Sequence, residues 1–323
     1  MGTYLVTGAA GFIAARTAGL LLDTGHTVVG LDNLNDYYDV RLKEHRLAAL
    51  AGRVRFTFVR ADIEDATALA GVFAAHRFDA VVNLAARAGV RASIENPRPY
   101  FSTNVDGTLN LLELMRQHGV KKFVLASSSS LYAGQATPFT EALAVNTPLS
   151  PYAASKKAAE MLAYSYHHLH GIDCSILRYF TVYGPASRPD MGLLRFTSWI
   201  DRGQPIQLFG DGSQTRDFTH VDDIARGTIA ALQPLGYEVI NLGGGKNPVT
   251  IADVIGRLEK LLGKKAVIDR KPFHLADLKE TGADISKAGR LLAWKPQVGF
   301  DDGLKQSVEW YRANAAWLQE IRL

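Results

Sequence analysis

Cysteine is nearly absent from this chain of 323 residues, and no membrane or targeting segment is evident. The single cysteine, Cys174, excludes an internal disulfide, and the apolar run at residues 172–177 indicates a small side chain in a buried strand. No basic neighbour would lower its pKa, so a reactive thiolate is not expected. No apolar run is long enough to span a membrane, and the sequence enters a predicted strand without a signal peptide. We therefore expect a cytoplasmic protein with no membrane partner.

Charge is also modest and dispersed. The chain has 36 Lys and Arg against 32 Asp and Glu, a formal net charge of +4. The basic residues form no cluster, so a nucleic-acid partner is not predicted. None of the 9 histidines stands with cysteine or carboxylates at the spacing of a metal site, so no metal is predicted. The composition, 47% hydrophobic and 21% charged, is that of an ordinary folded protein.

The first residues carry a nucleotide-binding pattern. A β-branched strand is predicted at residues 3–7, followed by the glycine loop GAAGFIA at residues 8–14 and an apolar helical pattern. A second strand at residues 27–31 ends on Asp32. A strand, a glycine loop, a helix, a strand and an acid in this order form the fingerprint of a dinucleotide site.

Each residue of this fingerprint has a physical task. Gly8 permits the tight turn, and Gly11 lets the backbone approach a pyrophosphate at the positive end of the helix. Ala14 takes the third glycine position, which the pattern allows. The Asp32 carboxylate suits ribose hydroxyls and repels a 2′-phosphate, so the pattern predicts NAD rather than NADP.

Strands continue to alternate with helices through the first half of the chain. The further strands are predicted at residues 54–59, 78–84, 120–126 and 172–178, and one long helix at residues 97–118. This alternation predicts an α/β fold with a Rossmann-type doubly wound parallel sheet. After Tyr179 the elements shorten, and residues 239–242 are expected to return to the sheet. We predict a cofactor domain at 1–180 that regains about 214–245, and a smaller, interleaved C-terminal domain mainly at 181–323.

A proton-transfer group is predicted beside the cofactor. The fifth strand delivers four serines, residues 127–130, to the sheet edge where ligands bind. Tyr152 and Lys156 are four residues apart, which places them on one face of a helix. An ammonium beside a phenol favours the phenolate and makes Tyr152 a general base. A serine hydroxyl would share the substrate proton, and the pattern leaves open which serine does so.

The segment at residues 33–52 is longer than a minimal connection. It is polar and aromatic, contains DYYD at residues 36–39, and continues into a charged helix. The sequence leaves open whether it is a surface flap or a cover over the substrate.

Over essentially its whole length the chain resembles the nucleotide-sugar branch of the extended short-chain dehydrogenase/reductase superfamily. The motifs that carry this resemblance are TGAAGFI at residues 7–13, Asp62 with Ile63, LAA at 84–86, NVDGT at 104–108, the serine run, Tyr152 with Lys156, and RDF at 216–218. Three further stretches resemble the UDP-glucuronic acid 4-epimerase family: LDNLNDYYD at 31–39, AGVR at 88–91, and RYFTVYGP at 178–185 running into RPDM at 188–191. The chain departs from that family at Ala14 and at Ala133, neither of which is a proton-transfer group.

The resemblance implies NAD as the cofactor, a UDP-sugar as the substrate, 4-epimerisation as the reaction, and a homodimer formed through residues 97–118 and 151–170. The implied cofactor contacts are Gly8, Gly11, Phe12, Ile13, Asp32, Asp62, Ile63, Leu84, Ala85, Ala86, Asn104, Tyr152 and Lys156. The implied catalytic residues are Tyr152, Lys156 and Ser128, although Ser129 or Ser130 could replace Ser128.

The implied substrate contacts are Ser128, Ser129, Thr181, Arg188, Arg91, Phe209, Arg216 and Asp277. Thr181 and Arg188 would hold the glucuronate carboxylate, with Arg87 and Arg91 as weaker candidates. Arg216 would contact the diphosphate, Phe209 the uracil and Asp277 a ribose hydroxyl.

Three other functions remain open. A UDP-glucose/UDP-galactose 4-epimerase would share every motif except a carboxylate-binding arginine. A UDP-glucuronate decarboxylase or a sugar-nucleotide 4,6-dehydratase is disfavoured, because residues 129–131 carry no additional acid. A protein that senses NAD without turnover would need neither Tyr152 nor Lys156 nor the serine run.

Overall fold

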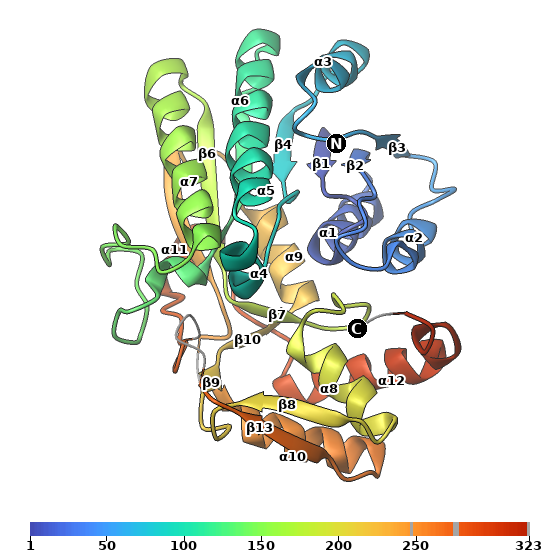
Figure 1. Ribbon diagram of the computed structural model, residues 1–323. Helices are drawn as coiled ribbons and strands as arrows, with labels where there is room; N and C mark the ends of the chain where they lie inside the picture. Colours follow the sequence, from blue (N-terminus) through green and yellow to red (C-terminus); the bar gives the residue numbers. More distant parts are fainter. Residues whose placement is uncertain (246–247, 274–277, 322–323) are drawn as a thin grey trace.

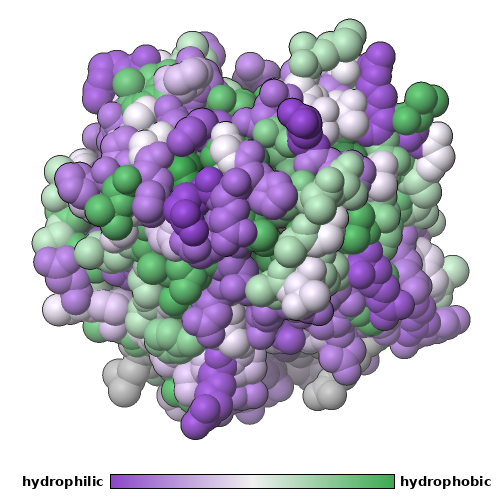
Figure 2. Space-filling model, turned by 90° about the horizontal axis from the view of Figure 1, so that it is seen from above, coloured by the Kyte–Doolittle hydropathy of each residue, from purple (hydrophilic) through white to green (hydrophobic). Residues whose placement is uncertain are grey.

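The computed structural model describes residues 1–245, 248–273 and 278–321. Figure 1 shows a sheet flanked by helices, with a smaller lobe packed at one end of it. Within the described ranges, no helix combines the length and apolar character needed to cross a membrane. The face seen in Figure 2 mixes hydrophilic and hydrophobic side chains, as surfaces of folded domains ordinarily do.

Seven parallel strands form the main sheet in the order β11-β6-β5-β4-β1-β2-β3. Their bounds are β1 Thr3–Thr7, β2 Thr27–Asp32, β3 Phe56–Arg60, β4 Ala80–Asn83, β5 Lys122–Ser128, β6 Asp173–Tyr179 and β11 Tyr237–Leu242. The predicted Rossmann-type doubly wound sheet is confirmed. The strand order reverses between β1 and β4, and ligands bind in such sheets at the carboxyl ends of the strands beside this reversal.

Helices cover both faces of the sheet, so that β4 and β5 are buried along their whole length. One face carries α1 Phe12–Asp23, α9 Val221–Ala230 and α11 Ser286–Leu292. The other carries α3 Ala66–Ala75, α6 Gly107–His118 and α7 Pro151–His170. The return of residues 239–242 to the sheet is confirmed by β11, which pairs with β6. The division of the chain into two domains near residue 180 stays a prediction.

Two boundaries near the cavity differ from those predicted. The helix expected over residues 97–118 is divided into α5 Arg98–Phe101, the π-helical turn η1 Ser102–Asp106, and α6. In this wider turn the Thr103 hydroxyl donates to Glu64 and the Asn104 amide donates to the Arg87 carbonyl. The fifth strand runs two residues further than predicted, because Ser127 and Ser128 continue the pairing with β6 before the 3-10 turn η2 Ser129–Tyr132.

The smaller lobe is built mostly from the second half of the chain. Its helices are α8 Gly192–Asp201, α10 Ile251–Leu262 and α12 Phe300–Leu318, which share a hydrophobic core with β8 Pro205–Phe209. The strand β13 Val267–Lys271 pairs with β8. Two short pairs connect the lobe to the sheet: β7 Thr181–Tyr183 with β10 Phe218–His220, and β9 Thr215–Arg216 with β12 Val249–Thr250. Two short helices complete the first half, α2 Val40–Ala48 and α4 Val90–Glu95.

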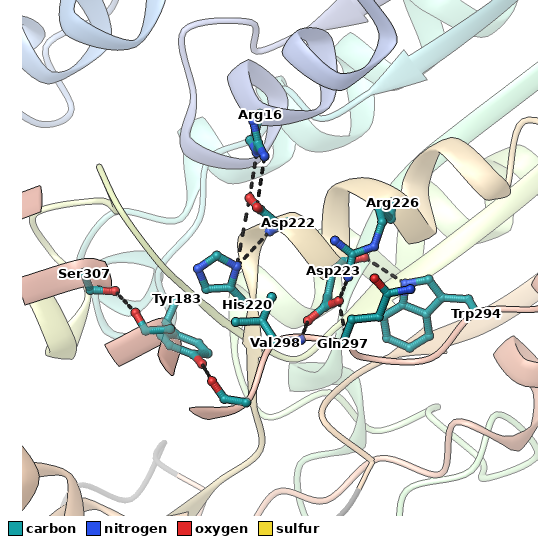
Figure 3. Close-up of polar contacts among 12 residues, drawn as sticks. Arg16, Tyr183, His220, Asp222, Asp223, Arg226, Trp294, Gln297, Val298 and Ser307 are labelled. Carbon is teal, nitrogen blue, oxygen red and sulfur yellow. Dashed lines mark hydrogen bonds and ion pairs between the residues drawn. The ribbon is translucent and has the colours of Figure 1, made fainter. Parts of the chain in front are cut away.

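Helix α9 ties the first helix of the sheet to the segment that leads into α12 (Figure 3). Arg16 of α1 makes two hydrogen bonds, 2.6 and 2.9 Å long, to the Asp222 carboxylate. The neighbouring Asp223 is fully buried and accepts from the backbone N–H groups of Gln297 and Val298 at 2.8 and 3.0 Å. Helix α9 therefore connects α1, which follows the glycine loop, to the segment that leads into the smaller lobe.

Candidate active site

One large cavity opens at the carboxyl ends of the strands and extends toward the smaller lobe. Most residues predicted to bind cofactor or substrate line it: Gly8, Gly11, Phe12, Ile13, Asp32, Asp62, Ile63, Leu84, Ala85, Ala86, Ser128, Ser129, Tyr152, Lys156, Thr181, Arg188 and Arg216. The chain thus brings together residues from loops that are far apart in sequence.

The glycine loop is shaped for a ligand that lies against the backbone. Gly8 has a φ of +69°, and a Cβ there would lie 2.9 Å from the backbone of Ala85. A Cβ on Gly11 would lie 2.8 Å from the Gly8 carbonyl oxygen. Gly11 is the N-cap of α1 and no side chain caps that end, which suits a pyrophosphate at the helix N-terminus. These features fit a dinucleotide.

Asp32 is held in place at the end of β2. Its carboxylate accepts from the backbone N–H of Ala10 at 3.0 Å and from that of Leu34 at 2.8 Å. The buried Lys43 Nζ lies 3.9 Å from Asp32 and donates to the Asn35 side chain at 3.1 Å. Burial lowers the pKa of Lys43, and the charge of Asp32 opposes this. Sequence reasoning missed Lys43, since a lysine in a charged helical pattern ordinarily indicates a solvated surface.

The serine beside Tyr152 is Ser128. Its hydroxyl is near enough to the Tyr152 hydroxyl to act on the Tyr152 pKa, and it accepts from the backbone N–H and the hydroxyl of Ser130 at 3.1 and 2.9 Å. Ser127 instead donates to Glu160 at 2.7 Å. The structure thereby singles out Ser128 among the four serines by position.

The electrostatics around Tyr152 differ from those expected. Burial raises the pKa of Tyr152, and the Ser128 hydrogen bond and the charge of Arg188 oppose that rise. Lys156 was expected to lower this pKa, but among the described residues the cation that does so is Arg188. Lys156 is directed at the sheet, where its Nζ donates to the Ala126 carbonyl at 2.8 Å. Burial lowers the pKa of Lys156 to about 8, against the opposing charge of Glu160.

Arg188 is fixed by a carboxylate of its own loop. Its Nε donates to Asp190 at 2.9 Å and its Nη2 donates to the other oxygen of the same carboxylate. Both residues line the cavity, as Thr181 does. The guanidinium is close enough to Tyr152 to influence its pKa. The role of Asp190 was missed, although its spacing of two from Arg188 was a possible signal.

Arg91, Phe209 and Asn104 are not among the residues that line the cavity, whereas Arg216 is. Arg91 of α4 stacks on the Phe209 ring at the end of β8, with its guanidinium carbon 3.8 Å from the ring centre. Arg216 donates to the carbonyls of Thr215 and Leu278, each at 2.8 Å. Asn104 lies behind the cavity wall, bonded to Arg87 and Ser155, and its contact with a cofactor stays a prediction. Asp277 lies outside the described residues.

Comparison with known proteins agrees with this site. The model of the NAD dependent epimerase/dehydratase family matches residues 4–243. The UDP-glucuronate 4-epimerase of Thermodesulfobacterium geofontis is 58% identical over 323 residues, which is all of both chains. The crystal structure of the UDP-glucuronic acid 4-epimerase of Bacillus cereus, in complex with UDP-glucuronic acid and NAD, is 40% identical, with a TM-score of 0.92 over 97% of this chain and 99% of that one. The UDP-glucose 4-epimerase of Thermotoga maritima, solved with UDP-glucose, is 32% identical, with a TM-score of 0.89 over 97% and 99%.

Proposed function

This chain belongs to the NAD dependent epimerase/dehydratase family and, within it, to the UDP-glucuronate 4-epimerases, and we propose that it interconverts UDP-glucuronic acid and UDP-galacturonic acid with NAD as cofactor. One observation carries this proposal above others. The Ser128–Tyr152 pair, a proton-transfer group, lies within electrostatic reach of Arg188, a carboxylate-binding group, in a cavity that also contains the glycine loop. A hydroxyl and a carboxylate of one sugar ring could occupy these two groups together.

We assign proton transfer to Tyr152 and Ser128. Tyr152, as phenolate, takes the proton from the sugar O4, and the Ser128 hydroxyl holds O4 in place. Bound NAD accepts the hydride from C4 and returns it to the opposite face after the 4-keto sugar has turned. Tyr152 returns the proton to O4 in the second half-reaction, so the chain ends each turnover in its initial state.

The chain holds NAD through the loops that line the cavity. We assign the pyrophosphate to the glycine loop, the adenine ribose to Asp32, and the nicotinamide ribose to Lys156. Asp62, Ile63 and residues 84–86 form further walls of this part of the cavity. Phe12 and Ile13 open α1 directly beneath the loop.

The protein must bind the glucuronate carboxylate in a fixed position, because the 4-keto intermediate is a β-keto acid that readily loses carbon dioxide. We assign this task to Arg188 and Thr181. Asp190 occupies two of the five N–H donors of Arg188 and thereby fixes the plane of the guanidinium, which leaves three donors for the substrate. A carboxylate fixed in charged form, with its bond to C5 out of line with the ketone, resists decarboxylation. We also assign the diphosphate to Arg216 and the uracil to the Arg91–Phe209 stack.

A UDP-glucose 4-epimerase is the second candidate, favoured by the similarity to the Thermotoga maritima enzyme. Its substrate carries an uncharged CH2OH group where glucuronate carries the carboxylate. The N–H donors of Arg188 that Asp190 does not occupy would then meet a single hydroxyl instead of a carboxylate, which can accept two parallel hydrogen bonds. This difference makes glucuronate the better substrate.

The test is to incubate the purified protein with UDP-glucuronic acid, without added NAD, and to resolve the products by chromatography and mass. An isomer of equal mass at the UDP-galacturonic acid position supports the proposal. A product lighter by carbon dioxide would make the protein a decarboxylase. No conversion even after NAD is added, together with conversion of UDP-glucose, would establish the second candidate instead.

The chain also offers a surface for a homodimer. Helix α7 exposes Met161, Tyr164 and Leu169, and α5 beside it exposes Phe101. We propose that two copies pair through this face. Light scattering should give twice the mass of the 35.2 kDa chain, and Met161→Lys combined with Leu169→Lys should give the single mass.

We propose the cytoplasm as the location, since NAD and UDP-sugars are metabolites of that compartment, and cell fractionation tests this.

A further inference from the structure

The segment at residues 33–52 contains an arginine that the reaction as described above does not use. Arg46 of α2 is only 4% exposed, although its helix has a charged sequence. Its hydrogen-bond partners in the described residues are three backbone carbonyls and one tyrosine hydroxyl. A buried guanidinium with such partners costs free energy of desolvation, so its place calls for a physical reason.

The contacts of Arg46 join two loops of the cavity. Its Nε donates to the carbonyl of Ala186 at 2.9 Å and its Nη2 to that of Ser187 at 3.1 Å. Its Nη1 donates to the carbonyl of Ala10, in the glycine loop, at 3.2 Å and to the Tyr38 hydroxyl at 2.7 Å. One planar side chain therefore connects the cofactor loop to the residues directly before Arg188.

The loop that Arg46 holds has an unusual backbone. It connects β7 with α8 and includes Gly184 with a φ of +146° and Ala186 with a φ of +55°. A left-handed conformation is disfavoured for alanine, so surrounding contacts must maintain it. Arg46 binds the carbonyls of Ala186 and of the next residue, and therefore fixes the backbone where its direction sets the position of Arg188.

Arg46 also contributes charge. Its guanidinium is near enough to Arg188 for the two charges to interact, and both lie close to Tyr38. Asp190 neutralises Arg188, whereas Arg46 hydrogen-bonds no carboxylate in the parts of the chain that the structure describes. The charge of Asp32 also acts on Arg46, so each of the two arginines has one carboxylate within electrostatic reach.

We propose that Arg46 is a positioning residue for the substrate carboxylate, acting by fixing the loop that presents Arg188. This inference rests on the proposed function. It gives the segment at residues 33–52, whose Asn35, Tyr37 and Tyr38 line the cavity, a task in recognition of the substrate acid. Lysine cannot replace Arg46, because one ammonium cannot reach carbonyls of two separate loops in the geometry of a planar fork.

The experiment compares Arg46→Lys and Arg46→Met with the unaltered protein and with Arg53→Met as the matched control. Arg53 follows the same helix and binds α1 through the Gly19 carbonyl and Asp23, but neither of these bonds reaches the loop of Arg188. The readouts are the ratio of decarboxylated to epimerised product from UDP-glucuronic acid, and KM and kcat separately. The product ratio does not depend on how much of the protein is folded.

We expect both Arg46 variants to raise the share of decarboxylated product and to raise KM on the order of tenfold to hundredfold, as misplacement of a binding group does. Arg53→Met should have the same product ratio as the unaltered protein. A product ratio and a KM that stay unchanged in folded Arg46→Met would overturn the proposal. If the unaltered protein does not epimerise UDP-glucuronic acid, the proposed function itself fails, which is a separate outcome.

Tyr38→Phe keeps the test decisive if the Arg46 variants do not fold. It removes one hydroxyl that accepts from Arg46 and leaves the ring in place. We expect a smaller change of the product ratio in the same direction. An unchanged ratio in Tyr38→Phe, with the Arg46 variants unfolded, would assign Arg46 to stability alone and reject the proposal.

Discussion

The Ser128 hydroxyl lies beside the Tyr152 hydroxyl, close enough to act on its pKa, although Ser128 ends β5 and Tyr152 lies in the first turn of α7. The contact depends on both boundaries. Pairing of Ser128 with Tyr179 extends β5 by one further residue, and Ser150 caps α7 by accepting from the backbone N–H of Ala153 at 3.2 Å. Both residues of the proposed proton-transfer pair therefore belong to regular secondary structure, which restricts their movement relative to each other.

Replacement of single serines tests this pair. Ser128→Ala should lower kcat by roughly 10²-fold, the lower range for a group engaged in proton transfer. Ser129→Ala is the matched control, because Ser129 also lines the cavity but begins the 3-10 turn, and its loss should be smaller. Steady-state kinetics with UDP-glucuronic acid decide between them. Equal losses of kcat in the two variants would show that Ser128 has no larger role in proton transfer than Ser129.

The pH profile should report Lys156. Its pKa of about 8 means that the ammonium is lost as pH rises through that value, so activity that needs the charge should decline there. Glu160 opposes the lowering of this pKa by burial, and Glu160 is itself faced by Arg178 at 2.8 Å and Lys157 at 3.5 Å. Glu160→Gln removes the negative charge, and the decline should therefore begin at lower pH. An alkaline limb of kcat/KM that does not move would contradict this account of Lys156.

Arg188→Ala should separate epimerisation from decarboxylation. Without the guanidinium, the bond between C5 and the carboxylate of the 4-keto sugar can come into line with the π orbital of the ketone. We expect slower epimerisation of UDP-glucuronic acid and a product lighter by carbon dioxide, measured by mass spectrometry. Arg188→Lys retains the charge without the two parallel donors, and should be intermediate. An unchanged rate with no lighter product would remove Arg188 from the site.

The glycine loop can be tested by adding a single methyl group. Gly8→Ala places a Cβ against the backbone of Ala85 and strains a φ of +69°, so retention of NAD should fall. Gly52→Ala is the control for strain alone, since Gly52 has a φ of +78° and no atom within 4 Å of its Cβ position. Fluorescence of bound NADH measures retention. Equal loss of NAD in both variants would attribute the effect to backbone strain rather than to the contact between the added methyl group and Ala85.

The contacts in Figure 3 predict different losses of stability for two substitutions. Asp223 is fully buried and bonded to Gln297, Val298 and Arg226, so Asp223→Ala should lower the free energy of unfolding by about 3–5 kcal/mol. Arg16 is partly exposed, and Arg16→Ala should lower it by about 1 kcal/mol or less. Urea unfolding compares the two. A larger loss for Arg16→Ala would mean that the helix-to-helix pair, and not the buried carboxylate, holds the lobes together.

Local patterns in the sequence determined the fold and the kind of chemistry. The strand, glycine loop and Asp32 predicted a dinucleotide, because a tight turn, a close backbone approach and an acid are each needed at a set spacing. Tyr152 and Lys156 could be identified as a pair from the sequence, because a separation of four residues places both on one face of a helix. Alternating strands and helices predicted the parallel sheet, and even the return of β11 was visible as a short apolar run.

Only the tertiary structure decided which of several similar residues act together. Strand pairing with β6 separates Ser128 from Ser129 and Ser130, and the bond of Ser127 to Glu160 separates Ser128 from Ser127. Arg188 is a cation that opposes the rise of the Tyr152 pKa, whereas the Lys156 ammonium donates to the Ala126 carbonyl. Lys43 and Arg46 are buried although their helix is charged in sequence, since burial of a charge depends on partners from other segments. Hydrophobic periodicity reports which residues face a core, but it carries no information about which distant carbonyl or carboxylate will meet a charged side chain.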